Sequence, residues 1–228
     1  MIIKFVVIFI SGLVNIILGF FIFKKNSKNP INFWYFILCL TGGGWGIVKA
    51  IQLSWMNIFW VEHLIIKLTF IFGILAPLSY LLLAYNFPYK LKAYGKKISF
   101  LVYFLPWLLV FLVMTGALKK ENDFIFNNVL YREINLFDFS IFAIYYFVYV
   151  FLGFFILLKK YLSANNIYRP QIKYLMIATV GTFLTTGFVS VILLLFNNFA
   201  YDWLGAIFLL IHFGVAAYLI FYKPSKNI

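Results

Sequence analysis

Charged residues are scarce in this chain: they make up 11% of the 228 residues, whereas 65% are hydrophobic. Soluble domains carry roughly a quarter charged residues and about half apolar ones. This composition excludes a soluble globular protein and indicates an integral membrane protein. Acidic residues are the rarest charged type, with 6 Asp and Glu against 19 Lys and Arg. The apolar segments fill the chain and leave almost nothing for a soluble domain.

Cysteine and histidine are nearly absent, which removes several kinds of site. The single cysteine, Cys39, excludes an internal disulfide framework, and we expect it to be a small packing residue. His212 has no second His, Cys or acid at ligand spacing, so a metal site is not supported. No acid lies in the middle of an apolar segment, which argues against proton-coupled transport and intramembrane hydrolysis. The last segment also lacks the lysine that a retinal Schiff base needs. The sequence therefore predicts neither a cofactor nor an enzyme activity.

Seven apolar segments of about 20 residues follow one another along the chain. At 1.5 Å rise per residue, each is long enough to cross a bilayer as an α-helix. The segments are continuously apolar and do not alternate, which favours helices over the strands of a barrel. We predict an all-α fold, with residues 1–228 forming a single domain of seven transmembrane helices. The predicted spans are about 5–23, 32–53, 60–87, 98–118, 139–158, 174–196 and 203–222.

The basic residues predict the orientation of this bundle. Thirteen of the 19 Lys and Arg residues lie in the turns after the first, third and fifth spans or in the C-terminal tail. All 6 acids lie on the opposite side. By the positive-inside rule, the N-terminus is outside and the C-terminus is cytoplasmic. The net charge of +13 is then a signal of topology and of attraction to anionic membrane lipid, and it does not indicate nucleic-acid binding.

The one long loop, residues 119–138, lies on the predicted outer side and contains both charge signs and several large apolar residues. Loops of this length are more often functional or self-packing than idle. Two interpretations stay open. The aromatic residues fold down on the outer face of the bundle as a lid, or the loop is a short interfacial hairpin or helix without a role in ligand binding.

Polar residues gather at the outer end of the third segment, residues 60–88. Glu62, His63 and Lys67 lie there at helical spacing, and a short turn brings Lys49 of the second segment to a similar depth. One interpretation is an outward-facing pocket in which Lys67 and His63 contact an anionic or polar ligand while Glu62 pairs with Lys49. The other is that both lysines extend to the outer surface and pair locally with Glu62.

Three features inside the spans bear on movement and assembly. Pro77 is predicted to kink the third helix and to release a backbone carbonyl, which makes this helix a candidate moving part. His212 is either a proton-sensitive switch or a neutral imidazole bonded to a neighbouring hydroxyl or carbonyl group. Gly42 and Gly46 are four residues apart, which permits close helix approach either inside the bundle or in a homodimer.

Small, aromatic and proline positions scattered over nearly the whole chain form a further pattern. They are Asn15, Gly19, Pro30, Asn32, Trp45, Pro77, Pro106, Tyr168, Arg169, Gln171, Gly181, Gly205 and Tyr218. In these positions the chain resembles the histidine kinase N-terminal 7TM region family of bacterial sensors. The resemblance implies a sensory bundle in the bacterial plasma membrane, whose seventh helix passes a signal to a cytoplasmic output partner such as a histidine kinase.

The sequence departs from such sensor kinases at its end, six residues after Tyr222. No phospho-accepting His segment or ATP-binding domain follows, so we expect either a sensor module that acts on a separate partner or a fragment. The rival interpretation is a small seven-helix transporter. Pro170 and Gln171 resemble the Pro-Gln dipeptide of one transporter group, but the first three spans contain none and the two halves show no repeat. We therefore favour a non-enzymatic sensor that works by ligand-biased helix rearrangement.

Overall fold

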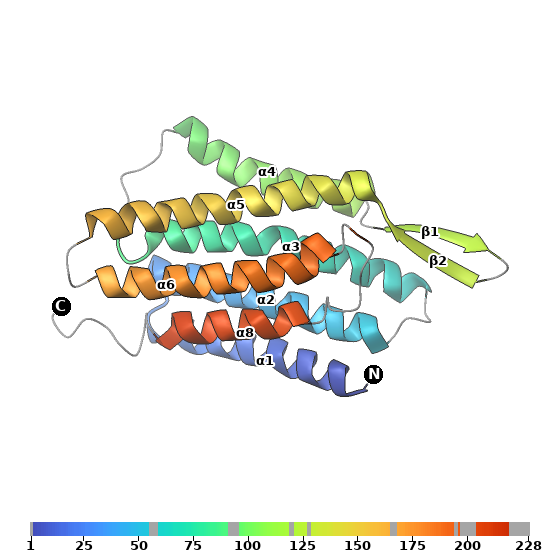
Figure 1. Cartoon of the computed structure of the whole chain (residues 1–228), viewed down its shortest axis with the longest axis horizontal. Helices are drawn as coiled ribbons and strands as arrows, with labels where there is room; N and C mark the ends of the chain where they lie inside the picture. Colours follow the sequence, from blue (N-terminus) through green and yellow to red (C-terminus); the bar gives the residue numbers. More distant parts are fainter. Residues whose placement is uncertain are drawn as a thin grey trace.

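The computed structural model describes residues 2–54, 59–90, 96–118, 121–126, 129–164, 168–193, 196 and 204–218. Within these ranges the chain forms seven α-helices, one π-helical segment and one β-hairpin, and the helices lie along the long axis of the molecule (Figure 1). The elements are α1 (Ile2–Lys25), α2 (Pro30–Ser54), α3 (Phe59–Asn86), α4 (Lys96–Thr115), β1 (Glu121–Phe126), β2 (Val129–Ile134), α5 (Leu136–Ser163), α6 (Arg169–Thr182), η1 (Phe183–Ile192) and α8 (Leu204–Ala217). The predicted helical bundle is confirmed, and the hairpin is the departure from an all-α fold.

Five helical segments in the described part of the chain are long and apolar enough to cross a membrane. They are Ile3–Lys25, Pro30–Gln52, Leu64–Asn86, Leu136–Ser163 and Arg169–Ile192, the last of which joins α6 and η1. Val102–Thr115 and Leu204–Ala217 are shorter apolar helices. Large apolar side chains are exposed on the outside of the bundle, among them Phe21 and Phe155, as expected for helices that face lipid. The chain is therefore a multi-pass membrane protein.

Two asparagine caps decide where α2 and α5 begin. Asn29 Oδ1 accepts a hydrogen bond from the backbone N–H of Ile31 at 2.8 Å. Pro30 takes the first helical position, where its missing N–H is not needed. Asn135 Oδ1 accepts from the backbone N–H of Asp138 at 3.2 Å in the same way. The first cap ends the turn between α1 and α2, and the second leads the hairpin directly into α5.

Glycines let α2 approach its neighbours closely. A Cβ atom on Gly12 of α1 would lie 2.7 Å from the carbonyl oxygen of Gly43, so the two backbones are in contact. A Cβ atom on Gly42 would lie 2.7 Å from the ring of Phe213 in α8, and Gly46 faces both α1 and α8. Gly42 and Gly46 therefore serve helix contacts inside the bundle, which is the first of the two interpretations of this pair.

The β-hairpin lies between α4 and α5. Its strands pair antiparallel, with Glu121 opposite Ile134 and Phe126 opposite Val129. The hairpin projects along the long axis of the molecule beyond the helices and does not fold across the end of the bundle (Figure 1). This arrangement agrees with the hairpin alternative for the long loop and not with a lid. The end of the bundle with the hairpin is hereafter the hairpin end.

Basic residues gather at the opposite end, where α1, α3 and α5 end and α2 and α6 begin (Figure 1). This end is hereafter the basic end. Its described basic residues are Lys24, Lys25, Lys28, Lys90, Lys96, Lys97, Lys159, Lys160, Arg169 and Lys173. α8 runs from the hairpin end towards the basic end, antiparallel to α6 (Figure 1). The last described helix therefore points to the end that carries most of the charge.

Candidate functional site

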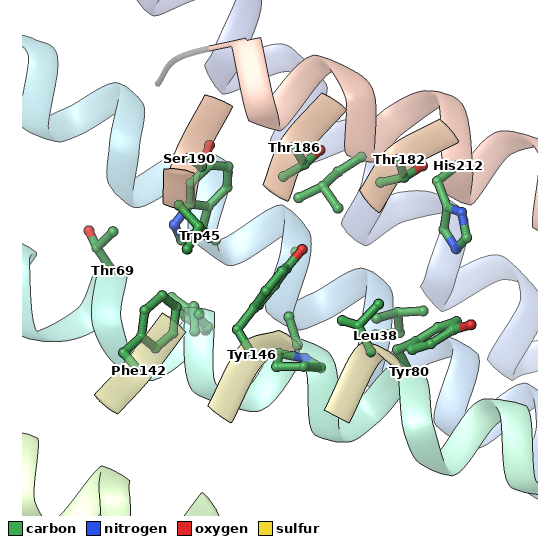
Figure 2. A pocket seen from close by; sticks show the side chains of 18 of the residues that line it. Leu38, Trp45, Thr69, Tyr80, Phe142, Tyr146, Thr182, Thr186, Ser190 and His212 are labelled. Carbon is green, nitrogen blue, oxygen red and sulfur yellow. The ribbon is translucent and has the colours of Figure 1, made fainter. Parts of the chain in front are cut away.

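A cavity of about 110 Å³ lies inside the bundle, bordered by α2, α3, α5, α6 with η1, and α8. Figure 2 shows two of its walls. Thr182, Thr186 and Ser190 line one wall from α6 and η1, and Phe142 and Tyr146 of α5 lie opposite. Five helical segments thus meet at a single space, so that its shape depends on how they pack together.

The cavity is long and narrow. Thr69 and Tyr80 both line it from α3 and are eleven residues apart, which corresponds to roughly 16 Å along a helix. Trp45 of α2 lies near the Thr69 end (Figure 2). Lys49 also lines the cavity and follows Trp45 by about one turn along α2. His212 of α8 lies at the Tyr80 end. A lysine therefore borders the cavity towards the hairpin end and a histidine borders it towards the basic end.

Several hydroxyl groups of the lining residues are engaged with backbone carbonyls. Thr69 and Thr179 each donate a hydrogen bond to the carbonyl four residues earlier, at 2.9 and 2.8 Å. Thr186 donates to the carbonyl of Gly205 at 3.3 Å, which joins η1 to α8. A hydroxyl oxygen that has donated its proton can still accept a hydrogen bond. These groups make the cavity wall mildly polar without placing a charge in it.

Tyr80 and His212 form the polar end of the cavity. Their rings meet edge to face with centroids 6.4 Å apart, and they are 6% and 4% exposed. The Tyr80 hydroxyl and His212 Nδ1 have no hydrogen-bond partner among the residues that the structure describes. The Thr179 hydroxyl interacts with Tyr80 but does not complete a hydrogen bond with the Tyr80 hydroxyl. A buried polar atom without a partner costs about 1–3 kcal/mol, so a further polar group that reaches these two atoms would be stabilised there.

Three of the six residues predicted from the sequence border this cavity: Lys49, Pro77 and His212. Lys49 is buried, and its Nζ donates to Gln52 Oε1 at 3.1 Å. Lys67 is not one of the lining residues. Its Nζ donates instead to the carbonyl of Met114, in the last turn of α4, at 3.2 Å. The carbonyls at a helix C-terminus favour a positive charge, so this contact stabilises the end of α4, and the contact of Lys67 with a ligand stays a prediction.

Glu62 and His63 belong to α3, near the hairpin end. Their side chains lie outside the described part of the structure. The pairing of Glu62 with Lys49 and the contact of His63 with a ligand therefore stay predictions.

The sequence predicts that Lys160 is one of the basic residues that flank the spans, but the structure buries it completely. Its Nζ donates to four carbonyl oxygens, those of Ala84, Tyr85, Phe87 and Tyr89, at 2.8, 2.7, 2.6 and 2.7 Å. These carbonyls belong to the last turn of α3 and to the residues that follow it. The ammonium group also lies 5.4 Å from the centre of the Tyr89 ring. Lys160 of α5 thus caps the C-terminus of α3.

Tyr80 and the hydroxyl wall were also missed from the sequence. For the wall a signal existed, because Thr182, Thr186 and Ser190 recur at every fourth position, which places them on one side of a helix. For Tyr80 there was none, since the chain contains 16 tyrosines and 30 phenylalanines. The importance of Tyr80 comes from its neighbour His212, which lies far away in the sequence.

Comparison with known families agrees with this architecture. Residues 7–224 match the family described as the N-terminal 7TM region of histidine kinase. No curated protein sequence matches the chain. The family match covers almost the whole chain and confirms the resemblance seen in its scattered glycine, proline and aromatic positions. The chain therefore belongs to the family of N-terminal seven-transmembrane regions of histidine kinases, a membrane sensor region and not the catalytic part of these enzymes.

Proposed function

We propose that the chain is a sensor that binds a small molecule in the central cavity and passes the change through α8 to a cytoplasmic output partner, such as a histidine kinase. The observation that carries this proposal is the position of α8. Leu209, His212 and Phe213 of α8 line the cavity together with residues of α2, α3, α5 and η1. An occupant that contacts all of these segments favours the helix arrangement that fits it best and shifts the population towards that arrangement.

Two hydrogen bonds hold α8 laterally in the described arrangement. The Tyr35 hydroxyl of α2 donates to the carbonyl of Phe213 at 2.7 Å, and the Thr186 hydroxyl of η1 donates to the carbonyl of Gly205 at 3.3 Å. Both bonds connect α8 to helices that line the cavity. A change in the cavity therefore acts on α8 near both of its ends. We propose that the resulting shift of α8 is the output, because the matched family is the N-terminal region of histidine kinases and α8 is the last described helix of the match.

The distribution of charge supports an orientation for this pathway. Because basic residues favour the cytoplasmic side, we propose that the basic end is cytoplasmic and that the hairpin end faces outwards. α8 then ends on the cytoplasmic side of a bacterial plasma membrane, where an output partner lies. The family match gives no support to the transporter interpretation.

A cavity-filling variant tests this proposal without knowledge of the ligand. Ala76 lines the cavity from α3, so Ala76→Phe occupies part of the space permanently. We expect a fusion of this variant to a histidine kinase core, reconstituted in lipid vesicles, to change its basal autophosphorylation at least about fivefold, since allosteric couplings of this kind span about 5–150-fold. The matched control is Val180→Phe, which adds bulk at an exposed position of α6. Equal autophosphorylation of the Ala76→Phe and wild-type fusions would reject the proposed function.

A further inference from the structure

We infer that the occupant of the cavity is a small, uncharged and mostly apolar molecule with one hydroxyl group, which Tyr80 and His212 recognise. This inference rests on the proposed function and assigns a ligand class to the same cavity. Three properties of the cavity carry it: the character of its walls, its size, and the two buried polar atoms at one end.

The walls favour an uncharged and largely apolar occupant. Most of the lining side chains are apolar, among them Leu38, Phe70, Phe139, Val150 and Leu209. Lys49 is the one Lys, Arg, Asp or Glu among the described lining residues, and its ammonium group already donates to a side-chain oxygen in α2. An ion loses its hydration when it enters such a space and needs a compensating partner there. An uncharged molecule has no such penalty.

The size of the cavity favours a small occupant over a drug-sized one. Its volume of about 110 Å³ is somewhat smaller than the roughly 150 Å³ of an engineered apolar cavity that binds benzene. Sites for drug-sized ligands are about 300–1,000 Å³. The occupant is therefore comparable to a single aromatic ring or a short alkyl chain.

The two buried polar atoms define the polar group of the ligand. The Tyr80 hydroxyl can donate a hydrogen bond, and a neutral imidazole has one nitrogen that accepts. A hydroxyl group can accept from Tyr80 and donate to His212 Nδ1. A carbonyl group lacks the donor, and an ammonium group lacks the acceptor. Because the two rings are in edge-to-face contact at one end of the cavity, a molecule with a single terminal hydroxyl group suits this site.

Phenol and benzene form a matched pair of probes, because they differ by one hydroxyl group. Each is titrated into the purified full chain in lipid nanodiscs, and binding is followed by ligand-observed NMR. The Ala76→Phe variant, in which the cavity is filled, corrects for partition into the lipid. We expect saturable binding of phenol, at least about fivefold tighter than that of benzene, since each hydrogen bond contributes roughly 0.5–1.5 kcal/mol and 1.4 kcal/mol is tenfold.

Variants assign the preference to the two residues. Tyr80→Phe removes one oxygen atom, and we expect it to weaken phenol binding about fivefold while benzene binding stays unchanged. His212→Phe is the second variant, and we expect it too to weaken phenol binding about fivefold and to leave benzene binding unchanged. If Tyr80→Phe does not fold, His212→Phe alone tests the inference. The control is Tyr149→Phe, because Tyr149 is equally buried but does not line the cavity and donates to the carbonyl of Val102 at 3.0 Å. We expect this control to bind both probes as the wild type does.

Three results would overturn the inference: no saturable binding of phenol, equal affinity for phenol and benzene, or phenol binding that both Tyr80→Phe and His212→Phe leave intact. Equal affinity is also the result expected if ordered water alone satisfies the two polar atoms. Binding is measured without a kinase, so the two proposals fail separately. A kinase fusion that responds to Ala76→Phe while phenol does not bind would retain the function and reject the ligand class. Phenol binding by the chain, together with a kinase fusion that does not respond to Ala76→Phe, would retain the ligand class and reject the proposed function.

Discussion

Lysine side chains cap neighbouring helices in this protein. Lys160 donates to the carbonyls at the end of α3, and Lys67 donates to the carbonyl of Met114 at the end of α4. The last four carbonyls of a helix have no partner within that helix. A lysine from the adjacent helix supplies the missing donor and a positive charge at the negative end of the helix dipole. The sequence alone predicts a basic flank for Lys160 and a ligand contact or a surface position for Lys67, and it gives no sign of either cap.

Lys160→Met tests this capping role. Methionine has a similar length but no donor, so four carbonyl groups lose their shared partner. We expect the free energy of unfolding to fall by about 3 kcal/mol, the upper part of the range for buried groups left unsatisfied. The measurement is denaturant unfolding of the purified chain in detergent micelles.

Lys159→Met is the matched control, because it removes the same charge from an exposed neighbour. We expect the free energy of unfolding of Lys159→Met to stay within about 0.5 kcal/mol of the wild-type value. Equal stability of the two variants would contradict a special role of Lys160.

The burial of Lys160 could not be predicted from the sequence. Lys159 and Lys160 are adjacent at the end of an apolar segment, and both match the basic flank of a membrane span. The structure shows that Ile156, Leu157 and Lys160 are all buried, which places them on the side of α5 that faces the bundle. The choice between the two lysines therefore depends on how α5 is rotated against α3, and this is a property of tertiary packing.

The helical segment formed by α6 and η1 changes its hydrogen-bond pattern along its length. α6 is α-helical up to Thr182, and η1 is π-helical from Phe183 to Ile192. π-helical turns are rare and frequently occur at functional sites. Here the π-helical segment presents Thr186 and Ser190 to the cavity. Its residues are all compatible with an ordinary α-helix, so no local signal predicts it, whereas the apolar run that makes the segment a membrane span is evident from the sequence.

Gly42→Ala tests the contact between α2 and α8. The added Cβ atom would lie 2.7 Å from the Phe213 ring, so that ring or the whole of α8 must shift to make room. Because overpacking of a filled interior costs typically 1–3 kcal/mol, we expect the free energy of unfolding to fall by about that amount.

Gly181→Ala is the control for this substitution. Nothing lies within 4 Å of a Cβ atom at Gly181, and alanine is the better helix former by up to about 1 kcal/mol. We expect its stability to be unchanged or slightly raised in the same unfolding measurement. A similar loss in both variants would show that the space next to Gly42 does not matter.

For the whole molecule, the number of helices was predictable and the cavity was not. Length and continuous apolar composition are local properties, and each predicted span contains part of one described helix. The cavity arises from the packing of five helical segments that are distant in the chain. Lys49 and His212 were predicted because polar residues stand out in apolar segments, whereas Tyr80 does not stand out among many aromatic residues. The long loop left two alternatives open, because its mixed composition fits both a lid and a hairpin.

The orientation of the bundle leads to a labelling prediction. Ser27 is exposed in the turn at the basic end, and Asn122 belongs to the hairpin. With the hairpin end outside, we expect Asn122→Cys to react with a membrane-impermeant maleimide in intact cells, and Ser27→Cys to react only after the cells are opened. The native Cys39 is fully buried and serves as an internal control that stays unlabelled. Labelling of Ser27→Cys alone in intact cells would reverse the orientation.

The capped end of α3 also has a consequence for the order in which the chain is assembled. The acceptor carbonyls precede their donor by 71 to 76 residues, so they are synthesised and leave the ribosome well before Lys160 does. During that interval these carbonyls lack the ammonium group of Lys160. The end of α3 becomes fixed when α5 has entered the membrane, and a nascent chain that stops before residue 160 keeps its first spans with that end unsecured.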